Sequence, residues 1–66
     1  MSVLKVIEIM SSSDTSWEDA TAKGLEKAGE TLKGIKSAWV KDQSVQVKDG
    51  GKLSYRVTLK VSFKVD

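Results

Sequence analysis

The clearest pattern in the chain is a strict alternation near its carboxyl end. From Tyr55 to Val65 every second residue is apolar or aromatic, and the residues between them are Arg, Thr, Lys, Ser and Lys. A period of two places one set on each face of a β-strand. The pattern therefore predicts a strand over about residues 52–65, with its apolar face turned toward the helix.

Two further segments are rich in β-branched and apolar residues. Residues 3–10 read VLKVIEIM, and residues 35–47 read IKSAWVKDQSVQV. Both compositions favour strands. The dipeptide Asp49-Gly50 is typical of a tight hairpin turn whose central residues take positive φ values. We therefore expect residues 35–65 to form a β-hairpin.

Between the first two strands the hydrophobic period changes to that of a helix. Thr15 and Glu18 have the spacing of a capping box, and Gly34 offers the left-handed conformation that often ends a helix. These signals predict a helix over about residues 16–33. Its apolar and small residues recur every three or four positions: Trp17, Ala20, Gly24, Leu25, Ala28 and Leu32.

Two glycines, Gly24 and Gly29, lie inside the predicted helix, where each costs about 1 kcal/mol relative to alanine. A close approach of the helix to the sheet is the simplest reason for them, and a ligand is the alternative. The order of elements predicts an α+β fold with β-α-β-β topology, in which a three-stranded antiparallel sheet wraps around one helix. We expect residues 1–66 to form one domain.

The predicted elements do not match in length. Strands of about 13 residues span roughly 43 Å, whereas a helix of about 18 residues spans roughly 27 Å. One helix therefore covers neither the whole length of the sheet nor its second face. We expect other copies of the chain to cover the remainder.

The composition of the chain supports self-association and limits the catalytic and metal-binding groups that it can offer. At 66 residues the chain is near the lower limit for a self-sufficient core, and it contains neither cysteine nor histidine. Disulfides, zinc–thiolate sites and catalysis by thiolate or imidazole are therefore excluded. No spacing of carboxylates, lysines or hydroxyls singles out a reactive pair. The sequence predicts a protein that is not an enzyme.

Charge and hydropathy argue against two classes of partner. The net charge is +2, with 11 basic and 9 acidic residues interspersed along the chain. Nucleic-acid binding favours clustered basic residues with aromatics between them, which this chain lacks. No apolar run approaches the length of about 18 residues that spans a membrane, and the amino-terminal run contains Lys5. We expect no nucleic-acid or membrane partner and a cytoplasmic location.

Several short stretches, spread over nearly the whole chain, resemble the dodecin family. The resemblance implies a small β-α-β-β subunit that assembles into a hollow homododecamer of cubic symmetry. This agrees with the expectation that one copy cannot cover its own sheet. The matching stretches are KVIEI at 5–9, TSWEDA at 15–20, ETL at 30–32, DQ at 42–43 and YRVTLKVSF at 55–63.

The resemblance implies flavin binding as one function. In flavin-binding members a tryptophan early in the second strand stacks on the isoalloxazine ring, and a glutamine on the third strand bonds to the ring edge. Alignment through ETLKGI and VSF puts these positions at Ser37 and Arg56, so both side chains are replaced. Trp39, two residues further along on the same face, is a candidate for a displaced stacking platform.

The candidate flavin pocket therefore comprises Ser37, Trp39, Arg56 and Gln43, and its ligand would be FMN, FAD, riboflavin or a related aromatic molecule. In the alternative, Trp39 packs against a neighbouring subunit, and Arg56 forms a salt bridge or a carbonyl contact at an interface. A bulge near Lys41 would change which residues share the face of Trp39, and the sequence leaves this open.

A second branch, the calcium-binding dodecins, is closer in local sequence through the TSWE helix start and through YR followed by SFK. Calcium takes six or more oxygen ligands, which a symmetric assembly can pool from several subunits. The candidate ligands are Asp42, Glu8 and Asp14. Asp42 lies in mid-strand, where aspartate is disfavoured, although pairing with a lysine across an interface would also explain it.

The sequence predicts a homododecameric protein that binds or stores a small molecule, with flavin or a related aromatic ligand at subunit interfaces. The alternatives are a calcium- or cation-binding assembly and a structural shell without a specific ligand.

Overall fold

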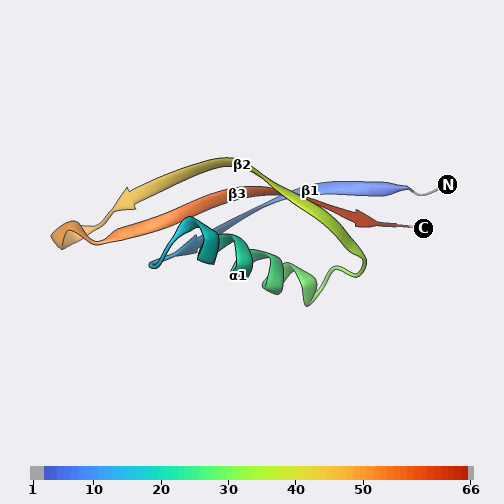
Figure 1. The fold of residues 1–66 in the computed structure, drawn as a ribbon, viewed down its shortest axis with the longest axis horizontal. Helices are drawn as coiled ribbons and strands as arrows, with labels where there is room; N and C mark the ends of the chain where they lie inside the picture. Colours follow the sequence, from blue (N-terminus) through green and yellow to red (C-terminus); the bar gives the residue numbers. More distant parts are fainter. Residues whose placement is uncertain (1–2, 66) are drawn as a thin grey trace.

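The computed structural model describes residues 3–65 and contains the main elements in the predicted order (Figure 1). A short 3-10 turn at Asp49–Gly51 joins the last two strands. The predicted β-α-β-β topology is therefore confirmed. The elements are β1 (Leu4–Ser13), α1 (Trp17–Gly29), β2 (Ile35–Val47) and β3 (Leu53–Lys64).

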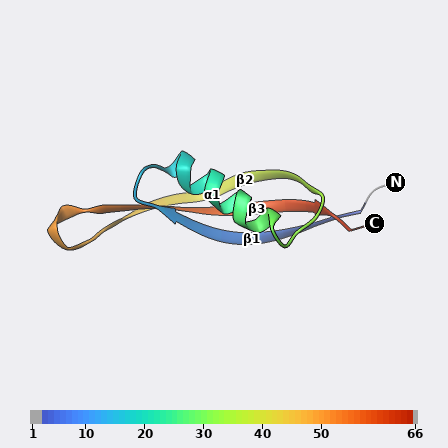
Figure 2. The ribbon, with the colours of Figure 1, turned by 90° about the horizontal axis from the view of Figure 1, so that it is seen from below.

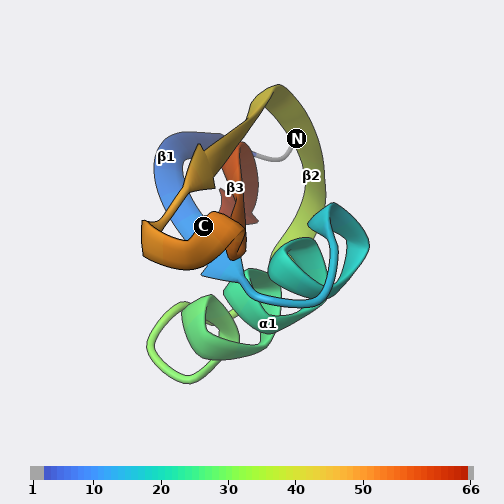
Figure 3. The same ribbon diagram turned by 90° about the vertical axis from the view of Figure 1, so that its left-hand side faces the viewer.

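The three strands form one antiparallel sheet with β3 in the middle, in the order β1-β3-β2. Viewed along the molecule, all three strands lie on the same side of α1 (Figure 3). The alternation in β3 is confirmed, because Val57, Leu59 and Val61 are fully buried and pack with Ala20 of the helix. These four side chains form the centre of a small core.

The glycine in the middle of α1 lies where the helix comes closest to the sheet. A Cβ atom at Gly24 would lie 2.8 Å from the Cβ atom of Ser11 and 3.5 Å from Cδ1 of Leu59. The predicted close approach is therefore confirmed at this position. It is wrong for Gly29, where a Cβ atom would meet nothing within 4 Å among the described residues.

The helix begins one residue later than predicted. Ser16, not Thr15, is the N-cap, and its Oγ atom accepts a hydrogen bond from the backbone N–H of Asp19 at 2.9 Å. The expected capping box of Thr15 and Glu18 is wrong because Thr15 belongs to the preceding turn. There its backbone N–H donates to Oγ of Ser13 at 2.9 Å.

The helix also ends earlier than predicted, at Gly29 instead of Lys33. The backbone N–H groups of Thr31 and Leu32 both donate to the carbonyl of Ala28, at 3.2 and 2.9 Å. Glycine and threonine are weak helix formers, so the segment after Ala28 turns back toward β2. Gly34 does have positive φ (74°), but it lies in the loop before β2.

The strand bounds agree closely with the prediction, with one clear exception. β2 has the predicted bounds, and β3 differs by one residue at each end. β1 continues beyond Met10 to Ser13, where it still pairs with β3. This pairing provides hydrogen-bond partners for the backbone N–H and C=O groups, and it does not depend on the type of side chain. In the hairpin turn the positive φ values belong to Gly50 and Gly51, not to Asp49 and Gly50.

The expected overhang of the sheet is confirmed. The molecule is 51 Å along its longest axis, whereas the 13 residues of α1 span about 20 Å. The end of the β2-β3 hairpin extends past the helix, and past β1, which stops opposite Tyr55 (Figures 1 and 2). Large apolar side chains are exposed at both ends of the sheet: Val45, Val47 and Leu53 on the hairpin, and Val3, Leu4, Val6 and Val65 near the termini.

Trp17 attaches this hairpin to the start of the helix. Its ring makes an edge-to-face contact with Tyr55, with centroids 5.2 Å apart and ring planes at 79°. The indole N–H donates to the backbone carbonyl of Ser44 at 3.0 Å. A single side chain thus connects α1 with both strands of the hairpin.

A carboxylate in the first turn of the helix fixes the connection between β1 and α1. The hydroxyl of Ser13 donates to the carboxylate of Asp19, and Nζ of Lys23 lies 3.0 Å from the same carboxylate. The hydrogen bond from Ser13, and then the contact with Lys23, hold the pKa of Asp19 below its usual value.

The two helix glycines predict opposite effects of the same substitution. Gly24→Ala gains helix propensity but forces β1 away from α1, so we expect a net loss of about 1–3 kcal/mol of unfolding free energy. Gly29→Ala, the matched control, meets no neighbour and should gain about 0.5–1 kcal/mol. Thermal midpoints at one fixed protein concentration measure both. Equal stability of the two variants would contradict the close approach at Gly24.

Asp19 predicts a dependence of stability on acid pH. A carboxyl group whose pKa is lowered by folding stabilises the fold above its unfolded pKa, and that contribution is lost as pH falls through the folded pKa. Asp19→Asn should therefore lower the thermal midpoint at neutral pH, and its difference from the parent protein should shrink below about pH 4. Ser13→Ala, which removes the larger cause, should move the pKa of Asp19 upward in an NMR titration. A difference independent of pH would contradict this account.

Candidate binding face

The candidate ligand residues gather on the side of the sheet turned away from α1. Directly paired residues of an antiparallel sheet share a face. The register therefore defines this surface, which we call the outer face. It comprises Leu4, Val6, Glu8, Met10 and Ser12 of β1, Ser54, Arg56, Thr58, Lys60, Ser62 and Lys64 of β3, and Ser37, Trp39, Asp42, Ser44 and Gln46 of β2.

A bulge in β2 decides which of its residues reach this face. The register shifts between Val40 and Asp42, which makes Lys41 an extra residue in the strand. Uninterrupted alternation would place Asp42 on the helix side together with Val40. The shift instead places Asp42 opposite Thr58, on the outer face.

The same bulge separates Gln43 from the other predicted pocket residues. Gln43 pairs with Val57, whose side chain is fully buried beneath the sheet, so Gln43 lies on the helix side of β2. Ser37, Trp39 and Arg56 all lie on the outer face. The structure thus brings three of the four predicted pocket residues onto one surface and places the fourth on the opposite one.

Trp39 is a large aromatic side chain left half uncovered on the outer face, with 47% of its surface exposed. It lies beside Lys60 on β3, and Glu8 of β1 completes this row across the sheet. The carboxylate of Glu8 forms an ion pair with Nζ of Lys41 at 3.1 Å. An exposed indole surrounded by charged side chains can stack on a planar ligand or pack against another copy of the chain.

Ser37 has a local role that the sequence did not show. Its hydroxyl shares a hydrogen bond with the hydroxyl of Ser62, with the two oxygens 2.7 Å apart. Ser62 is buried, and the pair joins β2 to β3 near the start of β2. The position that resembles the stacking tryptophan of flavin-binding dodecins therefore carries a small polar contact and no aromatic surface.

Arg56 lies across the strands at the far end of the outer face. Its Nη2 atom donates to Oε1 of Gln46 at 3.1 Å, and its Nε atom donates a long hydrogen bond of 3.5 Å to Oγ of Ser12. The sequence analysis predicted neither partner. Ser12 lies opposite Arg56 only because β1 extends beyond Met10. No sequence signal marked that extension.

The three acidic candidates for calcium lie apart in one copy of the chain. Glu8 pairs with Lys41, while Asp14 lies in the loop after β1, 3.8 Å from Nζ of Lys48. Asp42 lies on β2. Within residues 3–65, no three His, Cys, Asp or Glu side chains are grouped so that they could hold a metal ion. A calcium site built from these acids would need ligands from more than one copy.

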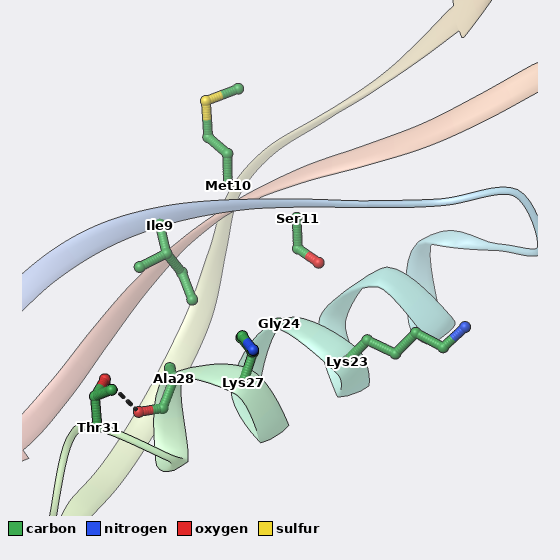
Figure 4. Close-up of a pocket in the computed structure, with 8 residues that line it drawn as sticks. All are labelled: Ile9, Met10, Ser11, Lys23, Gly24, Lys27, Ala28 and Thr31. Carbon is green, nitrogen blue, oxygen red and sulfur yellow. Dashed lines mark hydrogen bonds between the residues drawn. The ribbon is translucent and has the colours of Figure 1, made fainter.

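A groove of about 340 Å³ runs between β1 and α1 (Figure 4). Ile9 and Ser11 point toward the helix and Met10 points away from it, while Lys23 and Lys27 lie along the helix side of the groove. None of the predicted ligand residues lines this groove. A second hollow, near the hairpin, is lined by Asp14, Lys48, Lys52 and Leu53.

Among residues 3–65, no helix is long and apolar enough to cross a membrane.

Both the sequence and the fold are similar to those of one protein family. The dodecin family model matches residues 3–66. The calcium dodecin of Mycobacterium tuberculosis is 45% identical over 65 residues, which cover 98% of this chain and 92% of the relative.

Solved structures give the same result. The crystal structure of the Mycobacterium tuberculosis calcium dodecin has a TM-score of 0.89 at 42% identity, with 97% of this chain and 91% of the other covered. Dodecin from Streptomyces davaonensis has a TM-score of 0.92 at 28% identity, with 98% and 96% covered.

Proposed function

Because the chain belongs to the dodecin family, we propose that it is a homododecameric protein, without enzymatic activity, that binds or stores a small molecule. Each copy contributes one dodecin-like domain over residues 1–66. The proposed ligand is a flavin (FMN, FAD or riboflavin) or a related aromatic molecule held between copies. The partners are other copies of the chain and this ligand, and we propose a cytoplasmic location.

The single observation that carries the proposal is the exposed indole of Trp39. Exposed apolar side chains that share one face mark candidate sites for a ligand or another protein, and Trp39 shares the outer face with the exposed side chains of Leu4, Val6 and Met10. Ser37, two residues away on the same face, is small and leaves room beside the indole. A planar ring on Trp39 would be stabilised by aromatic stacking and by the burial of apolar surface, as aromatic pairs in proteins are.

Self-assembly is supported by the apolar side chains exposed at both ends of the sheet. One copy cannot cover them, because α1 is much shorter than the strands. Val47 at the hairpin end is 73% exposed, and Leu4 and Val6 near the other end are each about half exposed. Contact between the ends of different copies would bury both sets.

Calcium binding is a second candidate function, favoured by a specific relative. The Mycobacterium tuberculosis protein at 45% identity is a calcium dodecin, and its crystal structure is that of a calcium-chelating protein with a calcium-binding site. In this chain Asp42, Glu8 and Asp14 supply carboxylates. They are separate in one copy, so the proposed ion would lie between copies and be shared by them.

We predict that Trp39→Ala weakens riboflavin binding by about 10- to 100-fold, which corresponds to the loss of about 1–3 kcal/mol of stacking. Quenching of flavin fluorescence during titration with the assembled protein measures the dissociation constant. Met10→Ala is the matched control, since Met10 is also an exposed apolar residue of the outer face. It should leave binding unchanged. Unchanged binding in an assembled Trp39→Ala variant would exclude Trp39 as the platform.

The same protein, titrated with calcium chloride, tests the second function. A ligand bound only by the native assembly raises its thermal midpoint. A rise with calcium that Asp42→Asn removes, together with no quenching of riboflavin, would replace the flavin proposal by the calcium one.

A further inference from the structure

The end of the β2-β3 hairpin is a ribbon of two strands. β1 stops opposite Tyr55, so residues 46–54, which we call the free ribbon, pair only with one another among residues 3–65. A hairpin of two strands is marginally stable in water when nothing packs against it. The direction in which the free ribbon points therefore depends on contacts at its root, where the third strand ends.

Trp17 makes contacts at this root from the first residue of α1, at the end of the helix that faces the hairpin (Figure 1). Its ring packs edge to face on Tyr55 of β3, with centroids 5.2 Å apart, and its indole N–H donates to the carbonyl of Ser44 of β2 at 3.0 Å. One rigid side chain thus contacts both strands just before the free ribbon begins. It restricts the tilt and the twist of the ribbon relative to the helix.

The base on which Trp17 stands is itself held in place. Oγ of Ser16 accepts from the backbone N–H of Asp19 at 2.9 Å, and the carboxylate of Asp19 accepts from the hydroxyl of Ser13 at the end of β1. Oγ1 of Thr21 donates to the carbonyl of Trp17 at 2.9 Å. These bonds join the start of α1 to the sheet, so the indole has a fixed starting point.

The face of the hairpin that Trp17 contacts continues as an apolar surface beyond the helix. Val45 pairs with Tyr55 and Val47 pairs with Leu53, so all four side chains lie on the helix side of the sheet. Val47 is 73% exposed, and Val45 and Leu53 are also exposed. This is the hairpin part of the apolar surface that self-assembly would bury.

A second link between the start of the helix and the free ribbon is weak. Nζ of Lys48 lies 3.8 Å from the carboxylate of Asp14, and both side chains are largely exposed. Exposed ion pairs of this kind contribute little and are screened by salt. The contacts of Trp17 are therefore the stronger restraint on the free ribbon.

We propose that Trp17 is a positioning residue for self-assembly, which holds the free ribbon in the direction that lets its apolar face meet another copy of the chain. The inference rests on the proposed function, because it takes self-assembly as its premise. Only copies with a correctly directed ribbon can associate, so the apparent affinity falls with the fraction of such copies. A ribbon that is fixed beforehand also loses less freedom on association.

The test is a dilution series followed by native mass spectrometry. Trp17→Ala loses an aromatic pair and a hydrogen bond, and we expect it to raise the concentration at which half of the chains are assembled by at least about tenfold. Trp17→Phe keeps a ring but lacks the N–H donor, and should raise this concentration about threefold. Lys48→Gln, the matched control, removes the exposed ion pair and should change it by less than about twofold.

A disulfide across the free ribbon separates positioning from strand pairing. Gln46 and Ser54 are direct partners, and the Cα atoms of such partners lie within the range that a disulfide spans. Gln46→Cys with Ser54→Cys keeps the two strands together but leaves their direction relative to α1 free. Added to Trp17→Ala, it should recover less than about twofold of the lost assembly, measured against the parent protein with the same disulfide. Full recovery would overturn the positioning role, because Trp17 would then serve only to keep the strands paired.

Two other results would overturn the role of Trp17 and leave self-assembly intact: undiminished assembly of Trp17→Ala, or an equal loss in Lys48→Gln. A parent protein that stays monomeric at every concentration would contradict self-assembly itself, and the positioning role with it. If Trp17→Ala does not fold, Trp17→Phe with the same disulfide decides. An increase of about threefold in its half-assembly concentration would support the role, and no increase would overturn it.

Discussion

The structure depends on one mismatch of size: a helix of 13 residues packs against strands of 10 to 13 residues. Each residue advances a strand about twice as far as a helix, so α1 can cover only the middle of one face. The core is accordingly small and centred on Val57, Leu59 and Val61 of the central strand. The part of the sheet that α1 does not cover carries polar side chains and apolar side chains that other copies of the chain can bury. The candidate ligand residues lie in this uncovered part.

The register of β2 shifts twice, between Ile35 and Ser37 and between Val40 and Asp42, and the second shift decides which residues beyond Trp39 reach the outer face. Lys41 interrupts the alternation, so Asp42 reaches this face and Gln43 leaves it. The side chain of Lys41 in turn reaches Glu8 on the opposite edge strand. Acidic, basic and aromatic groups thus meet around Trp39 through a local irregularity of the backbone. Regular pairing would have placed Lys41 opposite Thr58 and Gln43 opposite Arg56.

The sequence predicted the parts of the fold that rest on periodicity. Alternation in β3 identified the buried face, and the bounds of β2 and the topology followed from composition and turn residues. It did not predict features that arise from pairing or from competing local bonds. Ser13 bonds to the backbone of Thr15, which made Ser16 the N-cap, and β3 extended β1 through three serines. Asp42 in mid-strand was the one sign of the bulge, since an aspartate that disfavours regular pairing is tolerated beside one. The resemblance to dodecins, confirmed by the family match, located the outer-face residues but could not supply their neighbours.

The central claim is that surfaces left uncovered by α1 are buried between copies of the chain. Native mass spectrometry of freshly purified, untreated protein tests it most directly. The account predicts a dominant species of about 86 kDa, the mass of twelve copies of the 7.2 kDa chain. A folded protein that remains a 7.2 kDa monomer at micromolar concentration would contradict it, because the exposed apolar ends and Trp39 would then face water in the stable state.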